Sequence, residues 1–291
     1  MEKVYFIREI TPENIVKIYE KVGKKLPGKV AVKLHSGEKG NQNYLRPKFV
    51  RPIVEYVNGT VVECNTAYSG ARNSTEKHRE LIKEHGWDKY FAFDLMDAEG
   101  PDLELPIRNG KILKGNLVGK NLANYDSMLV LSHFKGHAMG GYGGALKQLS
   151  IGCASSDGKS RIHTAGKVDN QEELWNNLPE QDRFLESMAD AASSVVDYFK
   201  GNIVFINIMK NISKDCDCDG NASAPCMADI GILASLDPVA VDQACLDLVY
   251  NSNDPGKDTL IERIESKHGV HTIEAADEIG VGSRKYELVQ M

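Results

Sequence analysis

Residues 128–147 read MLVLSHFKGHAMGGYGGALK, and they join an apolar run to a loop of unusual composition. Met128 to Leu131 predict a buried strand, and His133, His137 and Lys147 follow it among glycines. Such residues add little to a packed core, but they suit a ligand site at the carboxyl end of a parallel strand. The stretch therefore predicts an α/β fold whose functional site lies after this strand.

Apolar runs and helical periodicity alternate along the rest of the chain. Strands are expected over 4–7, 29–34, 61–64, 90–95, 103–107, 203–208 and 230–234, and helices over 46–58, 76–85, 180–199, 259–267 and 272–279, with further helices opening near Pro12 and Pro238. The expected fold is a mostly parallel sheet, or sheets, flanked by helices, with a cleft between two lobes. It is predicted as a single domain of residues 1–291, which can be divided into α/β lobes of about 1–125 and 126–291.

Composition narrows the classes of partner. A net charge of −6 and a pI near 5.8 argue against nucleic-acid and anionic-membrane surfaces, because both rely on clustered Lys and Arg. The chain begins without an apolar signal region and carries no run of about 20 apolar residues, so a cytoplasmic protein is expected. A small anionic ligand fits the site residues below, and a second copy of the chain or a redox partner protein is compatible with them.

The loop from His133 to Lys147 predicts an anion site. Glycines before a helix expose amide N–H groups, and Lys147 adds a positive charge. His133 and His137 are four residues apart, which places both on one side and favours a shared ligand, although two ordinary loop histidines remain an alternative. Arginines in loops after strands can clamp a carboxylate, or form surface ion pairs. The residues expected to bind substrate are Arg46, Arg72, His133, Tyr142, Gly143 and Gly144.

Cysteines form a second candidate site. Three of the six lie within eleven residues, at Cys216, Cys218 and Cys226. The aspartates at 215, 217 and 219 disfavour a thiolate unless a cation compensates, so an iron–sulfur cluster or a zinc ion is expected, with Cys153 as a fourth ligand. A redox thiol pair and solvated structural cysteines stay open. The loop 210–229 has few apolar anchors, so we expect a ligand to order it. Cys64 and Cys245 are expected in the core.

Several motifs together resemble the uncharacterised family called domain of unknown function 362. They are FKGH at 134–137, GYGGALK at 141–147, GCA at 152–154, DCDC at 215–218, DIGILAS at 229–235 and DPVAVDQ at 237–243. Many members resembling it carry a ferredoxin-like insert with two iron–sulfur clusters after the Gly-Cys-Ala motif. The Cys-rich run of that insert is missing here, so the core alone must carry the function.

Residues 137–147 are also similar to the Gly-Tyr-Ser-Gly-Gly-Arg-Lys region of nickel-pincer lactate racemases. That resemblance implies His137 as a catalytic base, Lys147 as a holder of a nickel-pincer nucleotide, and His163 as a metal ligand. Asn43 to Pro47, which contains Arg46, is similar to the Asp-x-Thr-Arg-Pro motif of the racemases, whereas Gly70 to Asn73 lacks the second histidine of their Gly-Thr-His-Arg motif.

Three functions follow from these features, and whether the protein is an enzyme stays open. The first is a metal- or iron–sulfur-binding protein, as an oxidoreductase component acting on a small anionic ligand. The second is a racemase- or isomerase-like enzyme that acts on a small carboxylate with His137 as base. The third is a non-catalytic ligand-binding protein.

Overall fold

An eight-stranded sheet forms the centre of the protein in a computed structural model, which describes residues 1–100 and 102–291. Its strand order is β12 (Tyr286–Gln290), β1 (Glu2–Ile7), β11 (Gly231–Ser235), β10 (Ile203–Met209), β7 (Ser127–His133), β2 (Val30–Lys33), β3 (Gly59–Glu63) and β4 (Phe93–Leu95). Every neighbouring pair is parallel except the two that involve β11. The mostly parallel α/β fold expected from the sequence is confirmed.

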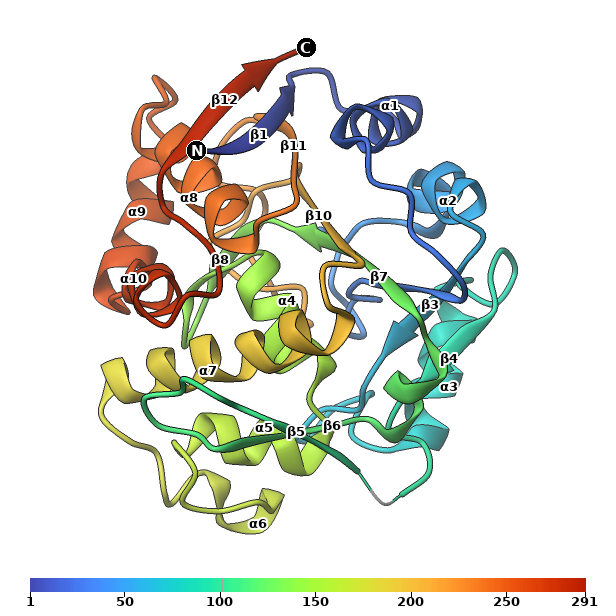
Figure 1. The fold of residues 1–291 in the computed structure, drawn as a ribbon, viewed down its shortest axis with the longest axis vertical. Coiled ribbons are helices and arrows are strands. Elements are labelled where there is room, and N and C mark those ends of the chain that lie inside the picture. The colour runs from blue at the N-terminus through green and yellow to red at the C-terminus, as the bar shows by residue number, and fades with distance from the viewer. Residues whose placement is uncertain (101) are drawn as a thin grey trace.

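Helices cover both faces of this sheet (Figure 1). Side chains alternate between the faces along β7: Leu129 and Leu131 pack with one group of helices, and Met128 and Val130 pack with the other. The first group is α1 (Pro12–Val22), α2 (Pro47–Tyr56) and α3 (Thr75–Glu84). The second includes α4 (Ala145–Cys153), α7 (Gln181–Phe199), α8 (Pro238–Tyr250), α9 (Lys257–Ser266) and α10 (His271–Glu278).

Smaller elements complete the chain. They are the hairpins β5 (Leu103–Pro106) with β6 (Gly115–Val118) and β8 (Lys135–His137) with β9 (Gly141–Gly143), the turn η1 (Lys120–Asn124), and the helices α5 (Ser156–His163) and α6 (Gln171–Leu174). The β8–β9 hairpin was expected as a plain loop. β12 was not expected, and it pairs in parallel with β1 at the edge of the sheet. No helix in the described part of the chain is long and apolar enough to cross a membrane.

Sheet order reverses between β2 and β7. From β2 the chain proceeds to β3 and β4 on one side, and from β7 it proceeds to β10 and β11 on the other. Strands from residues 1–125 and 126–291 thus share one sheet. Loops diverge at such a point and leave a crevice at the carboxyl ends of the strands. The residues that follow β2, β3, β7 and β10 therefore meet at the carboxyl ends of these strands.

Candidate functional site

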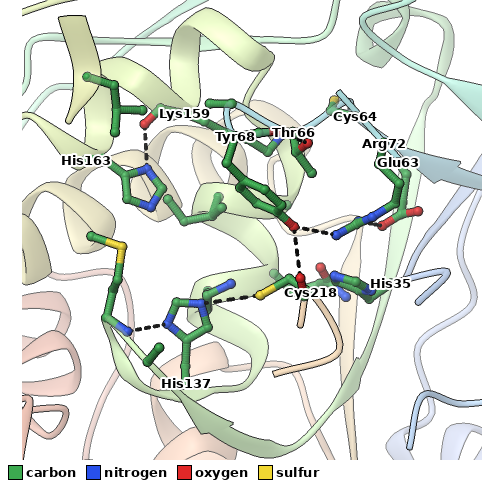
Figure 2. A pocket seen from close by; sticks show the side chains of 18 of the residues that line it. His35, Glu63, Cys64, Thr66, Tyr68, Arg72, His137, Lys159, His163 and Cys218 are labelled. Atoms are coloured by element: carbon green, nitrogen blue, oxygen red, sulfur yellow. Dashed lines mark hydrogen bonds and ion pairs between the residues drawn. The ribbon is translucent and has the colours of Figure 1, made fainter. Parts of the chain in front are cut away.

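A cavity of about 270 Å³ opens at the carboxyl ends of these strands (Figure 2). Its lining comes from segments far apart in sequence, which the strand ends and the helices α4 and α5 bring together. The polar side chains that line it include Lys33, His35, Glu63, Tyr68, Arg72, His137, Lys147, Gln148, Lys159, His163 and Cys218. The predicted residues His137, Lys147, His163 and Arg72 all lie here.

Positive charge exceeds negative charge in the cavity lining. Arg72 is balanced by carboxylates, at 3.2 Å from Glu38 and 3.4 Å from Glu63. Three lysines are not balanced in this way: among the residues that the structure describes, no carboxylate oxygen lies within ion-pair distance of their Nζ atoms. They are Lys33, Lys147 and Lys159. A buried cation without a counter-ion is costly, so the cavity favours an anionic ligand.

Two of these lysines are held in place by uncharged oxygens. The Lys33 ammonium donates to the carbonyl of Leu34 at 2.6 Å and to Gln148 Oε1 at 3.1 Å, and burial lowers its pKa. The Lys159 Nζ donates to the carbonyl of Ala154. Lys147 has no hydrogen-bond partner for its Nζ within the described residues, and its side chain is partly exposed. Lys147 is therefore the cation best placed to meet a ligand.

A thiol–imidazole cluster lies beside the lysines. The Nε2 atom of His137 and the sulfur atoms of Cys216 and Cys218 lie within 4.8 Å of one another, a separation at which they could hold a metal ion. The two sulfurs therefore lie close together. The loop reaches the β8–β9 hairpin because the Gly136 amide donates to the carbonyl of Ser213, at a point where a side chain on residue 136 would collide with the backbone of Lys214.

The surroundings of Cys216 favour its thiolate. A hydrogen bond from Cys218 is the largest cause that holds the pKa of Cys216 well below its ordinary value, with Lys147 and His137 acting in the same direction against burial. The backbone amide of Cys218 also points at the Cys216 sulfur, at 3.4 Å. Sequence reasoning expected the neighbouring aspartates to oppose a thiolate. It allowed a thiolate only if a cation compensates, and here the Cys218 hydrogen bond and the Lys147 charge provide that compensation.

The ring orientation of His137 bears on what the cluster can bind. Its Nδ1 accepts hydrogen bonds from the amides of Met139 at 3.1 Å and Gly140 at 2.9 Å, so the proton of the neutral ring sits on Nε2. Burial lowers the pKa of His137, which keeps the ring neutral. Nε2 then donates toward the Cys218 sulfur, 3.9 Å away. A histidine that ligates a metal normally has the opposite arrangement, with its second nitrogen donating to an acceptor.

His163 presents the opposite tautomer to the cavity. Its Nδ1 lies 2.7 Å from the carbonyl of Lys159 and must donate to it, which leaves a lone pair on Nε2 (Figure 2). The ring stacks on Phe184 with 5.0 Å between centroids. Burial lowers the pKa of His163 to about 4. His163 is therefore a neutral hydrogen-bond acceptor at physiological pH.

The loop 210–229 is ordered by protein contacts. Asp217 is buried, and its carboxylate contacts His133 Nδ1 at 2.9 Å and Lys135 Nζ at 3.0 Å. Burial opposes its ionisation, but these two groups hold the pKa of Asp217 below its usual range. Asp215 pairs with Arg263 at 3.2 Å. Two of the three clustered aspartates are therefore paired with cations, which reduces the self-repulsion expected of this loop. His133 accordingly anchors this loop and is absent from the cavity lining.

The anion at the start of α4 belongs to the protein. The Asp242 carboxylate accepts from the amides of Ala145 at 2.7 Å and Leu146 at 3.0 Å, and from Tyr142 and Asn207. A ligand was expected at Gly143 and Gly144, but the carboxylate from α8 occupies that place, where a Cβ on Gly144 would collide with it. Tyr142 is buried and bonded to Asp242, so it does not face a ligand.

Three further predicted residues lie apart from the cluster. Arg46 is exposed at the start of α2, where its guanidinium covers the Tyr44 ring at 3.9 Å. The sulfur of Cys226 contacts the carbonyl of Ile212, and Cys153 is buried in the core with its sulfur near the carbonyl of Gln148. The set of four cysteine ligands is therefore corrected to two, Cys216 and Cys218. Cys64 and Cys245 are buried as expected, although Cys64 also reaches the cavity.

Sequence reasoning missed Lys33, His35, Glu63 and Lys159. A charged residue ending an apolar strand is a signal that could have identified two of them: Lys33 ends β2 and Glu63 ends β3, both buried at the carboxyl edge of the sheet. Lys159 lies inside α5 and has no comparable local signal.

Comparisons with known proteins place the chain in a family. No curated protein matches it. The chain is similar to the lactate racemase apoprotein of Thermoanaerobacterium thermosaccharolyticum (12% identity, TM-score 0.49, covering 86% of this chain and 57% of that one). It is also similar to a structural-genomics protein of Thermotoga maritima (12% identity, TM-score 0.41, covering 92% and 58%). The chain thus spans less than two thirds of the length of both. The family described as domain of unknown function (DUF362) matches residues 30–247, and the chain belongs to that family.

Proposed function

We propose that the protein binds a small anionic molecule in the cavity, next to a reactive thiolate shared by Cys216 and Cys218. The observation that carries this proposal is the charge of the lining, in which Lys33, Lys147 and Lys159 have no carboxylate partner in the described structure. Cys218 lines the same cavity, and His137 and Lys147 favour the thiolate beside it. A bound anion would satisfy the lysines and lie within reach of a nucleophile.

This arrangement suits an enzyme that acts on a small carboxylate or phosphate. In the cavity lining, His163 offers an unprotonated Nε2 that can accept a proton, and the Cys216 thiolate lies behind Cys218, next to the cavity. His137 is less suited to the role of base that the racemase resemblance implies, because its Nε2 carries the proton. For an isomerase-like reaction, the geometry favours His163 as the base and His137 as a donor that stabilises the thiolate.

Equilibrium binding tests the proposal. Isothermal titration with acetate and inorganic phosphate should detect binding to the wild-type protein, and Lys147→Met should weaken it by about 1–3 kcal/mol while leaving the melting temperature nearly unchanged. Lys83→Met, which removes an exposed lysine from α3, is the matched control. Equal loss of affinity in both variants, or a fall in stability limited to Lys147→Met, would contradict a ligand-binding role for Lys147.

A metal centre at His137, Cys216 and Cys218 is the second candidate, favoured by the 4.8 Å grouping of their ligand atoms. Two thiolates and an imidazole suit zinc, or iron with ligands from elsewhere, but the tautomer of His137 opposes this role. Metal analysis of protein purified without oxygen separates the candidates. Our proposal expects well under one metal ion per chain. Stoichiometric metal that the double variant Cys216→Ser, Cys218→Ser loses would instead favour the metal centre.

A further inference from the structure

Apolar side chains also line the cavity, and its charges do not explain this apolar wall. These apolar side chains come from the β8–β9 hairpin, from α4 and from the segment that contains α6. They are Met139, Ile151, Leu174 and Trp175. A ligand consisting of an anionic group alone would leave this wall against water, so the lining indicates a molecule with an apolar part as well.

Trp175 is the most exposed member of this wall. It lines the cavity, yet 52% of its surface is open to solvent. The chain just before it is held in place: the neighbouring Leu174 is buried, and Asp169 forms an ion pair with Arg161 of α5 at 2.6 Å. The other tryptophan, Trp87, is fully buried and donates to the carbonyl of Ser36. Trp175 stacks on no aromatic ring of the described residues, and a large flat side chain left open at a cavity in this way provides a platform for a ring.

Resting on the proposed function, we propose that the natural ligand carries a planar ring joined to a carboxylate or phosphate, and that Trp175 selects it by stacking on the ring. The anionic group is held by the lysines, among them Lys147, whose ammonium has no partner within the described residues. A cavity of about 270 Å³ accommodates a single ring with its anionic group. It lies below the usual range of pockets for drug-sized ligands, roughly 300–1,000 Å³.

Fluorescence provides a direct test, because Trp175 is one of only two tryptophans in the chain. The wild-type protein is titrated with benzoate, phenyl phosphate, cyclohexanecarboxylate and acetate. Benzoate or phenyl phosphate should quench the fluorescence and bind about five- to tenfold more tightly than cyclohexanecarboxylate, whose ring is not flat. The tighter of the two aromatic probes identifies the anionic group. Trp175→Phe, in which Trp87 is the remaining tryptophan, should show no quenching of tryptophan fluorescence.

Calorimetry on variants separates this inference from the function on which it rests. Trp175→Ala should weaken the aromatic probes by about five- to tenfold and leave acetate within about twofold, whereas Trp175→Phe should keep most of the aromatic preference. Equal affinities for the aromatic and cyclohexane probes, or unchanged benzoate binding in Trp175→Ala, would overturn the role of Trp175. If Lys147→Met still weakened acetate in that case, the proposed function would stand. Failure of all four probes and of inorganic phosphate to bind the wild-type protein would overturn both.

Discussion

The Nε2 atom of His137 lies 3.9 Å from the sulfur of Cys218 and carries the proton of its ring. This relationship makes the histidine a donor to the thiol pair. Its hydrogen bond and the positive charge of Lys147 both favour a thiolate in the pair. The cluster therefore combines a nucleophile with an anion site, and its supporting contacts lead to separate predictions.

Asp217→Asn should loosen the cysteine loop. The buried Asp217 carboxylate balances the charge of Lys135 and contacts His133. The uncharged side chain of asparagine would leave the Lys135 cation without this counter-ion. We expect a loss of about 3 kcal/mol in the free energy of unfolding and faster proteolysis within 210–229. Asp219→Asn is the control, because Asp219 is exposed in the same loop. The hydrogen bond that its Oδ1 accepts from the Asn221 amide can also be accepted by the side-chain oxygen of asparagine. Equal proteolysis of the two variants would contradict an anchoring role for Asp217.

Asp242→Asn should destabilise the whole fold. Four donors converge on its carboxylate, and the amide NH₂ would face at least one of them. Burial raises the pKa of Asp242 to about 6, so the comparison belongs at pH 8, where the carboxylate is charged. Urea unfolding should show a loss of about 3 kcal/mol. The exposed Asp277→Asn on α10 should lie within about 0.5 kcal/mol of the wild type, and a similarly small effect at Asp242 would remove its role as the cap of α4.

His163 should make the protein less stable in mild acid. Its pKa is about 4 in the folded protein, against about 6.5 when unfolded, so the unfolded chain binds more protons between these values. Stability from this group is therefore complete above about pH 6.5 and falls as the pH drops toward 4.

His163→Asn keeps a donor for the Lys159 carbonyl but removes the titration. The difference in unfolding free energy between wild type and variant should change by about 2 kcal/mol from pH 7 to pH 4.5. Proton NMR of the His163 ring gives the folded pKa directly. A ring that titrates near 6.5, with parallel stability curves for the two proteins, would show that His163 is not the buried neutral acceptor described above.

Local patterns were sufficient to predict most of the strands and helices. The apolar runs of β7 and β10 and the caps of α1 and α8 depend on neighbouring residues, and Thr11 and Asp237 cap these two helices, which open at Pro12 and Pro238 as expected. The edge strand β12 was missed because it is short and mostly exposed, so it has no apolar pattern.

The site could be predicted only in part. His137, Lys147 and His163 meet because each follows a strand end or the helix after it, which the sequence indicates. The Asp242 carboxylate at the start of α4 comes from α8, almost 100 residues away, and no local sequence pattern predicts this contact. Cys226 was grouped with Cys216 by proximity in sequence, but its amide and sulfur both turn to Ile212. Contacts between segments far apart in sequence therefore determine the positions of Asp242 and Cys226.

The most direct test of a thiolate beside an anion-binding cavity compares two alkylating reagents that differ in charge. Iodoacetate is itself a small carboxylate, whereas iodoacetamide is neutral, and free cysteine reacts more slowly with iodoacetate. We predict that iodoacetate labels the Cys216–Cys218 pair faster than iodoacetamide, by about tenfold, as cationic clefts concentrate anions. Lys147→Met should reverse this preference and Lys83→Met should not, with rates measured by peptide mass spectrometry. Slower labelling by iodoacetate in the wild-type protein, unchanged by Lys147→Met, would contradict the account.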